Sequence, residues 1–251
     1  MVVPSKNVAS RPRRDRIGQQ TTSPRPSAVA DGSVPIARAV VVSGSGRYAD
    51  PWHPFAETSA AIAAVLAAAG LDVTVDDQVD TRLADVSDVD LLVLNIGAVD
   101  EGDDARDAAT RRGLLAYVAS GRPLLACHSS ATSLQPMPEW EDVLGGIWVR
   151  GTTMHPPWSR AHVLVDTDAH PITSGVPDFE IDDERYTHLR VSPAVTPLAW
   201  HEHEGARHPL MWTHMAGRAR VVYDALGHDA ASYAAAEHRT LIAQAAAWLL
   251  G

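Results

Sequence analysis

A histidine stands where one apolar stretch of the sequence turns polar. Residues 123–127 read Pro-Leu-Leu-Ala-Cys, and the next six read His-Ser-Ser-Ala-Thr-Ser. A strand that passes into small polar residues is typical of a strand-to-helix elbow, whose apex needs small residues two places before and after it. His128 meets this requirement through Ala126 and Ser130, and Ser129 meets it as well. We therefore predict an elbow with residue 128 or 129 at its apex, and an imidazole there could give or take a proton near neutral pH.

Cys127, directly before this histidine, is predicted to face the core. The larger Leu125 stands two places before it, which does not suit an apex. A free cysteine usually packs as a small hydrophobic residue. It is the single cysteine of the chain, so no intramolecular disulfide can form and a reducing cytoplasm is the expected compartment.

A glycine-rich turn follows an earlier apolar run. Residues 39–42 read Ala-Val-Val-Val, and residues 43–46 read Ser-Gly-Ser-Gly. Glycine lets the backbone approach a ligand closely, so Gly44 and Ser45 are candidate substrate contacts, although a plain turn fits the same residues. The run lacks the complete G-x-G-x-x-G pattern, and the chain has no G-x-x-x-x-G-K-[ST] run. We expect neither a dinucleotide site nor a nucleotide-phosphate loop.

Both turns belong to a chain that alternates strands with helices. Apolar runs predict strands over residues 39–42, 71–75, 90–96 and 123–127, and helical spacing predicts helices over residues 55–69 and 105–120. Strands that are apolar throughout indicate a mainly parallel sheet covered on both faces, so the predicted fold class is α/β, a three-layer sandwich. Ligands bind at the carboxyl ends of such strands, where both turns lie.

After residue 145 the apolar segments become shorter and predict additional mixed or antiparallel strands. These segments cover residues 147–149, 162–165, 198–200, 210–213 and 219–223. A helix over residues 237–250, with one apolar stripe, is expected to close the chain.

Composition and charge limit the expected partners. The 251 residues are 45% hydrophobic, which fits one domain over residues 36–251 after a disordered basic tail over residues 1–35. The formal charge is −10, and the tail holds six Lys or Arg against two Asp, so the remainder carries −14 and would repel nucleic acid. No apolar run approaches the about 18 residues that cross a bilayer, so a membrane is not an expected partner either.

An ordered series of motifs over residues 38–250 resembles the trehalose-utilisation (ThuA-like) family. The order in which the motifs occur is more specific than any single one. After the elbow come Pro-Glu-Trp at 138–140, Leu-Gly-Gly at 144–146, His-Pro at 155–156, His-Pro-Ile-Thr-Ser-Gly-Val-Pro at 170–177, Asp-Glu-Arg-Tyr at 183–186, Pro-Leu-Met-Trp at 209–212, Arg-Val-Val-Tyr at 220–223 and Leu-Gly-His-Asp at 226–229.

This resemblance implies a flavodoxin-like, class I glutamine-amidotransferase-like fold. It also implies a role in the metabolism of trehalose, a related disaccharide or a 3-keto sugar, with a small-molecule sugar as substrate and an oxidoreductase as functional partner. The sequence has His128 where such amidotransferases carry their nucleophilic cysteine, so we expect no glutaminase activity. Whether the chain forms a homo-oligomer is left open.

Side chains that exchange protons or bind hydroxyl groups are the candidates for a sugar site in the matched motifs. Histidine and carboxylate groups serve acid–base chemistry near neutral pH. The catalytic candidates are His128, Glu184, His155 and His228, and the substrate-binding candidates are Gly44, Ser45, His53, Ser129, Tyr186 and Asp229. We expect Asp229 or a backbone group to orient the ring of His228. Trp52 and Trp158 are candidate stacking platforms, although core packing suits each tryptophan better.

Two other functions remain open from the sequence. One is a noncatalytic sugar-binding or regulatory module, and the other is a metal-dependent hydrolase. Acid–base chemistry requires no cofactor, but the histidines are also compatible with a divalent metal. The chain has no H-x-x-x-H or H-E-x-x-H spacing, so a metal site would have to be assembled from distant segments. Residues 201–203 read His-Glu-His and could chelate, but an exposed polar loop is the favoured interpretation.

Overall fold

The computed structural model describes residues 36–99 and 102–251. Ile36–Gly251, the range of the predicted domain, form one compact unit. The predicted disordered tail over residues 1–35 lies outside the described residues.

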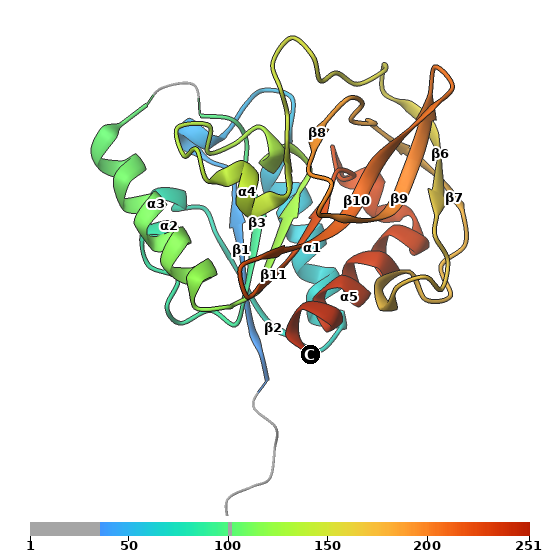
Figure 1. The fold of residues 1–251 in the computed structure, drawn as a ribbon. Helices are drawn as coiled ribbons and strands as arrows, with labels where there is room; N and C mark the ends of the chain where they lie inside the picture. Colours follow the sequence, from blue (N-terminus) through green and yellow to red (C-terminus); the bar gives the residue numbers. More distant parts are fainter. Residues whose placement is uncertain (1–35, 100–101) are drawn as a thin grey trace, which may run out of the picture. The chain divides into compact units, whose positions relative to one another are not determined.

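Five parallel strands form one half of a nine-stranded sheet (Figure 1). They are β1 (Arg38–Ser43), β2 (Asp72–Asp76), β3 (Leu91–Asn95), β4 (Leu124–Cys127) and β11 (Ala219–Asp224), in the order β2-β1-β3-β4-β11. This is the flavodoxin-like order, in which the chain moves first to one side of β1 and then to the other. Because β3 and β4 are apolar on both faces, all of their residues are buried, as the sequence predicted.

Four antiparallel strands extend the same sheet beyond β11. They are β10 (Ala206–Ala216), β9 (Thr196–His203), β6 (Ser159–Val165) and β7 (Phe179–Asp183), and a separate two-stranded sheet pairs β5 (Gly146–Ile147) with β8 (Arg190–Val191). Additional antiparallel strands in the C-terminal half are therefore confirmed. One predicted segment, residues 219–223, instead joins the parallel half as β11, next to β4.

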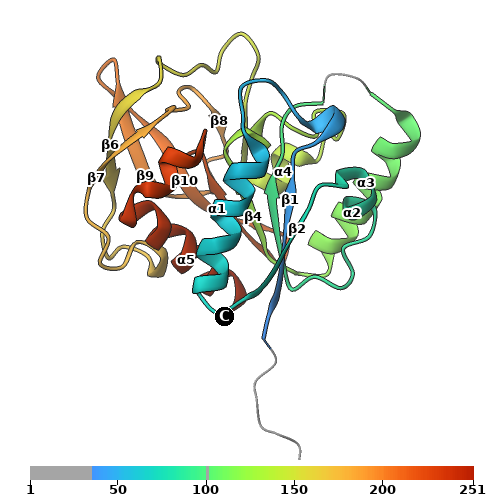
Figure 2. The same cartoon turned by 180° about the vertical axis from the view of Figure 1, so that it is seen from behind.

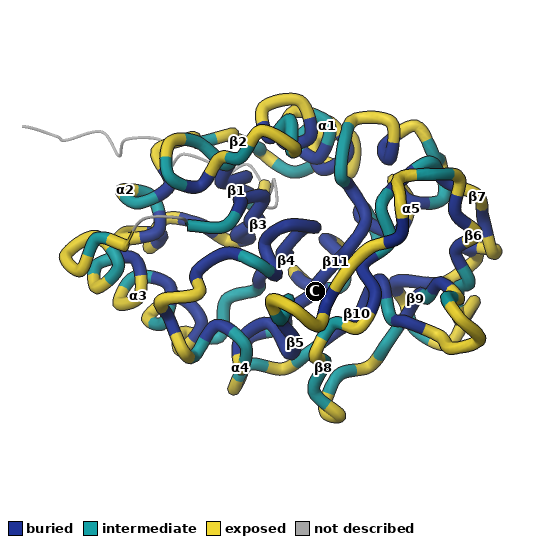
Figure 3. Tube along the Cα trace, turned by 90° about the horizontal axis from the view of Figure 1, so that it is seen from above, coloured by how far each residue is buried: buried dark blue, intermediate teal, exposed yellow. Residues whose placement is uncertain are grey.

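Helices cover both faces of the parallel half (Figures 2 and 3). The helices α1 (Phe55–Ala68) and α5 (Ala236–Leu250) pack against each other on one face, and α2 (Val79–Ala84) and α3 (Asp104–Ala119) pack together on the other. α1 lies in the connection from β1 to β2, and α2 and α3 lie in connections that cross the sheet in the other direction, so right-handed crossovers place them on opposite faces; α5 follows the last strand. The short α2 and α4 (Trp140–Leu144) were not predicted, because fewer than two turns give too little apolar periodicity to recognise.

The core contains two tryptophans with satisfied indole groups. Nε1 of Trp140 donates a hydrogen bond to the Ser130 carbonyl at 3.0 Å, and Nε1 of Trp212 donates one to the Leu144 carbonyl at 2.8 Å. Cys127 is buried in this core, as predicted. Within residues 36–99 and 102–251, no helix combines the length and the apolar character that a membrane crossing needs.

Candidate active site

The predicted elbow is present, and His128 is its apex. Strand β4 ends at Cys127, and a short 3-10 helix, η2 (His128–Ala131), begins at once. His128 has a φ of 41°, the left-handed conformation that a sharp reversal requires and that side chains other than glycine rarely adopt. The other candidate apex, Ser129, is buried, and its hydroxyl donates a hydrogen bond to the Ile96 carbonyl at 3.1 Å.

The ring of His128 is held on several sides. Its Nδ1 donates a hydrogen bond to the Ala225 carbonyl at 2.7 Å, and its own backbone carbonyl accepts one from the Tyr223 hydroxyl at 2.8 Å. The imidazole packs against the ring of Tyr186, with the centroids 4.4 Å apart. Because a carbonyl oxygen can only accept, the proton belongs on Nδ1, and in the neutral ring Nε2 carries a lone pair. The residue is 1% exposed, so it forms the buried end of the site.

Glu184 is the carboxylate around which the histidines gather. It directly follows Asp183, the last residue of β7. Its Oε2 lies 3.2 Å from Nδ1 of His228 and 3.6 Å from Nε2 of His128. Its Oε1 lies 3.6 Å from Nδ1 of His155. The structure therefore brings together the four residues that the sequence offered as catalytic candidates.

Asp183 positions the two segments that carry Glu184 and His228. Its buried carboxylate accepts hydrogen bonds from the backbone N–H groups of Glu184 at 2.8 Å, Gly227 at 2.8 Å and His228 at 3.2 Å. It also accepts one from the Ser232 hydroxyl at 2.6 Å. These bonds tie the end of β7 to the loop after β11, so both side chains have fixed starting points. The sequence showed Asp183 only as part of a polar motif and did not indicate this role.

The partner of the His228 ring is Glu184 and not Asp229. The Asp229 carboxylate instead caps η4 (Ala230–Ala234) by accepting a hydrogen bond from the Ala231 N–H at 2.8 Å. The expectation that Asp229 orients the His228 ring is therefore wrong, because a residue that begins a 3-10 turn uses its carboxylate on the backbone N–H groups of that turn.

His53 joins the same group from the loop between β1 and α1. Its Nδ1 donates to the Asp50 carboxylate, at 2.7 Å from Oδ2, and the same carboxylate accepts the backbone N–H groups of Trp52 and His53 at 2.9 Å. The His53 ring centroid lies 5.1 Å from that of His128 and 4.9 Å from that of His228. The sequence offered His53 as a substrate contact and did not indicate Asp50, although its spacing of three residues suits a turn that closes on itself.

One donor atom from each of His53, His128, Glu184 and His228 lies within 4.8 Å of the other three. Nε2 of His53 and Nε2 of His128 are buried and have no hydrogen-bond partner, and Nδ1 of His228 is buried beside Oε2 of Glu184, at 3.2 Å. Buried polar atoms in folded proteins are nearly always satisfied, so two unpaired ring nitrogens beside one carboxylate make this cluster a candidate ligand site.

Burial and the neighbouring polar groups shift the pKa values of Glu184, His228 and His53 in opposite directions. Burial raises the pKa of Glu184, but the imidazoles of His128 and His228 outweigh this effect and hold the pKa well below its usual range. The contact with Glu184 raises the pKa of His228, against the effect of burial. Burial lowers the pKa of His53, against the hydrogen bond to Asp50. The site therefore combines a carboxylate that stays ionised with imidazoles of unequal basicity.

A cavity of about 740 Å³ opens over the cluster. His53, Glu184 and His228 line it, His155 stands at its more exposed side, and His128 lies beneath them. The wall also presents three aromatic side chains and one cation: Trp52, Trp148, Tyr186 and Arg150. Trp52 is 71% exposed, so the expectation that it packs in the core is wrong and its face belongs to the cavity.

A family model described as ThuA, trehalose utilisation, matches residues 38–249. The chain belongs to this family. The ThuA match covers every strand from β1 to β11 and all but the last residue of α5, and it includes all the residues of the cluster. A comparison with curated protein sequences gave no match.

Solved structures show the same fold at low sequence identity. A ThuA-like protein from Parabacteroides merdae superimposes with a TM-score of 0.72 and 18% identity, covering 86% of this chain and 90% of that one. A ThuA-like protein from Bacteroides uniformis gives a TM-score of 0.68 and 15% identity, covering 90% and 95%. A β-galactosidase from Rahnella sp. R3 gives 0.58 and 18%, but the match covers 86% of this chain and only 32% of the enzyme.

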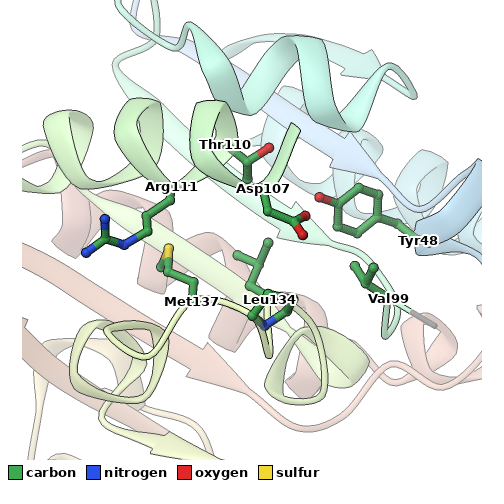
Figure 4. A pocket seen from close by; sticks show the side chains of 8 residues that line it. Tyr48, Val99, Asp107, Thr110, Arg111, Leu134 and Met137 are labelled. Atoms are coloured by element: carbon green, nitrogen blue, oxygen red, sulfur yellow. The ribbon is translucent and has the colours of Figure 1, made fainter. Parts of the chain in front are cut away.

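Of the six residues predicted to bind substrate, His53 and Tyr186 line the cavity of this ThuA-family protein, whereas Ser129, Asp229, Ser45 and Gly44 do not. Ser45 lines a separate hollow of about 380 Å³, and its hydroxyl donates a hydrogen bond to the Asp77 carbonyl at 2.5 Å. Gly44 is required for packing, because a Cβ there would lie 2.7 Å from Cγ of Phe55. A third hollow, between Tyr48 and Met137, holds only about 10 Å³, which is room for about one water molecule (Figure 4).

The His-Glu-His run at residues 201–203 is not an exposed loop. It forms the end of β9, where the side chains alternate between the two faces of the sheet. His201 is 1% exposed, and its Nε2 donates a hydrogen bond to the Tyr186 carbonyl at 3.2 Å, whereas Glu202 is exposed. The exposed-loop interpretation is therefore wrong. The other candidate platform, Trp158, is 48% exposed and does not line the cavity.

Proposed function

We propose that this ThuA-family protein is an enzyme that processes trehalose, a related disaccharide or its 3-keto derivative in the cavity over the histidine cluster. The observation that carries this proposal is the composition of that one cavity. Titratable side chains, such as His155 and Glu184, line the same cavity as the aromatic side chains of Trp52 and Trp148.

The size and chemistry of the cavity suit a sugar of this class. Its volume of about 740 Å³ lies within the usual range of small-molecule sites, about 300–1,000 Å³. The faces of aromatic rings stack on the apolar faces of sugar rings, and charged or polar groups such as Arg150 bind hydroxyl oxygens. A flat apolar ligand would use the aromatic wall but would leave the charged groups unpaired.

The arrangement of the cluster supports proton transfer as the chemistry. His155 is the most accessible of its imidazoles, and its Nδ1 lies 3.6 Å from Oε1 of Glu184. An imidazole between solvent and a half-buried carboxylate can take a proton from a substrate and return it. We assign this role to His155, and we assign to His128, Glu184 and His228 the stabilisation of charge on the reacting sugar. If the substrate is a 3-keto sugar, an oxidation must supply it, which is the work of an oxidoreductase.

The test is turnover of trehalose, related disaccharides and their 3-keto derivatives by the purified protein and three variants. His155→Gln and Glu184→Gln are each expected to lose at least about 100-fold in kcat/KM, because positioned acid–base groups contribute about 10²–10⁴-fold and groups that stabilise charge about 10²–10³-fold. His162→Gln is the matched control. His162 is exposed, its Nδ1 lies 2.7 Å from Oε1 of Glu180, and it does not line the cavity. Wild-type rates in both site variants would remove this mechanism. Sugar binding without any turnover would identify a noncatalytic sugar-binding module.

A further inference from the structure

We propose that His53, His128, His228 and Glu184 bind one divalent transition-metal ion at the floor of the cavity. The inference deepens the proposed function and rests on it for the role of the ion in sugar chemistry. The binding itself follows from the geometry of the cluster and can be tested alone.

The unsatisfied nitrogens are the first argument. Nδ1 of His128 donates to the Ala225 carbonyl, so Nε2 of the neutral ring is a lone pair that faces the carboxylate of Glu184 at 3.6 Å. Nδ1 of His53 donates to Asp50, which leaves its Nε2 in the same state. Lone pairs buried beside a carboxylate repel one another. A cation at their centre converts this repulsion into attraction, because neutral imidazole and carboxylate are metal ligands.

The spacing of the donor atoms is the second argument. Ligand atoms about 2.0–2.1 Å from a tetrahedral zinc ion lie about 3.3 Å apart. Oε2 of Glu184 lies 3.2 Å from Nδ1 of His228 and 3.6 Å from Nε2 of His128. The four residues place one donor atom each within 4.8 Å of the others, so small side-chain rotations bring the set to coordination distance. The 3.6 Å separation is too long for a hydrogen bond but close to the separation of two ligands on one metal.

The partners behind the imidazoles are the third argument. Metal-binding histidines usually donate their second ring N–H to a carboxylate or a backbone carbonyl, which sets the tautomer and the ring orientation. His53 donates to the carboxylate of Asp50, and His128 donates to the carbonyl of Ala225. Both rings are thereby prepared to present a lone pair to the centre of the cluster, before any ion is bound.

The sheet explains why such distant residues meet. His128 follows β4 and His228 follows β11, which is parallel to β4, while His53 lies in the loop after β1. Each of the four pairs from β11 through β10, β9 and β6 to β7 is antiparallel, so β7 again points in the same direction as β11. Glu184 follows β7 and therefore lies at the same edge. This edge holds the carboxyl ends of the strands, where α/β folds bind their ligands.

The donor set selects the class of metal. Three imidazoles and one carboxylate suit zinc, manganese, iron or cobalt, whereas Mg²⁺ and Ca²⁺ prefer oxygen ligands throughout. An ion held there would act as a Lewis acid on a sugar oxygen at the cavity floor. His155 lies outside the ligand set and remains free to carry protons.

The test uses the full chain, expressed without a histidine tag, stripped with a chelator and titrated calorimetrically with ZnSO₄. We expect one zinc ion per chain, and a cobalt-substituted protein with the visible absorption of a four-coordinate site. His228→Gln and Glu184→Gln should each weaken zinc binding at least 100-fold. Asp50→Asn should weaken it about 10–100-fold, as removing a group behind a ligand does. His162→Gln and His155→Gln are the matched controls and should bind zinc as the wild type does.

Folding of the variants is checked separately by circular dichroism and by the melting temperature without metal. Zinc should raise the melting temperature of the wild type and of His162→Gln, but not of Glu184→Gln. The absence of saturable zinc, manganese and cobalt binding, or equal binding by the ligand variants, would overturn the proposal. Zinc binding without sugar turnover would leave the metal site and remove the proposed function. Turnover at an unchanged rate by the stripped protein would overturn the role of the ion in sugar chemistry, while the calorimetric titration decides the metal site itself.

Discussion

The buried carboxylate of Asp183 accepts a hydrogen bond from the hydroxyl of Ser232 at 2.6 Å. This contact joins the end of β7 to η4, two segments that are far apart in the sequence. With the N–H groups of Glu184, Gly227 and His228, it gives one carboxylate four donors. The position of the whole histidine cluster therefore depends on a residue that does not itself enter the cluster.

Asp183→Asn is expected to destabilise the protein by about 2–4 kcal/mol, because the new amide group would face backbone N–H donors with a donor of its own. Ser232→Ala removes one donor and leaves the carboxylate with three, so it should cost about 1–2 kcal/mol. Urea unfolding of both variants measures the two values. Equal stabilities of Asp183→Asn and wild type would contradict the role given to this carboxylate.

Gly227 is expected to tolerate no side chain. Its φ is +106°, and a Cβ there would lie 2.6 Å from the hydroxyl oxygen of Tyr233. Gly227→Ala should therefore destabilise the protein by about 2–4 kcal/mol, the sum of backbone strain and overlap. Gly175→Ala is the matched control, because Gly175 also has a positive φ, of +69°, but has no atom within 4 Å of the added Cβ. The difference between the two melting temperatures measures the overlap, and equal losses would refute it.

The imidazole of His201 should make stability depend on pH. Burial lowers its pKa to about 4, and the neighbouring His208 and Arg185 act in the same direction, while the Tyr186 carbonyl opposes them. The unfolded chain takes up a proton near the ordinary value of about 6.5, and the folded protein does so only near 4. The contribution of the neutral His201 ring to the free energy of unfolding is therefore fully present above about pH 6.5, and it is lost as the pH drops towards 4.

This dependence is measured as the free energy of urea unfolding between about pH 7 and pH 4.5, for wild type and His201→Gln. The variant has no group to protonate at this position, so its curve should be flatter over this interval. The difference in free energy of unfolding between the two proteins at about pH 7 measures the lost hydrogen bond to Tyr186, and it is subtracted from the values at lower pH. Two parallel curves would show that another group is responsible.

Trp52 should contribute to ligand binding and not to folding. It is 71% exposed and lines the cavity, so Trp52→Ala removes a stacking face without opening the core. We expect sugar affinity to fall roughly 3- to 10-fold, the equivalent of about 0.5–1.5 kcal/mol for an aromatic contact, with an unchanged melting temperature. Trp158→Ala is the control, since Trp158 is similarly exposed but lies outside the cavity. Similar losses from both would show that the stacking face is elsewhere.

Cys127 should be unreactive in the folded protein. Burial raises the pKa of its thiol well above the ordinary value, and the negative charge of Asp224 adds to the effect. Because the thiolate is the reactive form, iodoacetamide should label the thiol rapidly only after unfolding in guanidinium chloride. Mass spectrometry of the native protein should show no alkylation on the same timescale. Rapid labelling of the native protein would contradict this prediction and would indicate an accessible, reactive thiolate at Cys127.

Local features of the sequence determined a large part of the fold. The apolar runs at β1, β3 and β4 predicted buried parallel strands, because a strand that is covered on both faces must be apolar on both. The small residues around His128 predicted the elbow, because the steric demand of a sharp reversal falls on residues next to it in the chain. Such requirements are satisfied within a few residues, so they are visible in the sequence.

Tertiary structure alone decided which side chains meet. His53, His128, Glu184 and His228 lie on four separate segments, and their convergence depends on the order and direction of nine strands. The same dependence placed Trp148, which the sequence offered as part of a short strand, in the wall of the cavity. The contacts among these residues are set by distances across a sheet edge, which no spacing along the chain encodes.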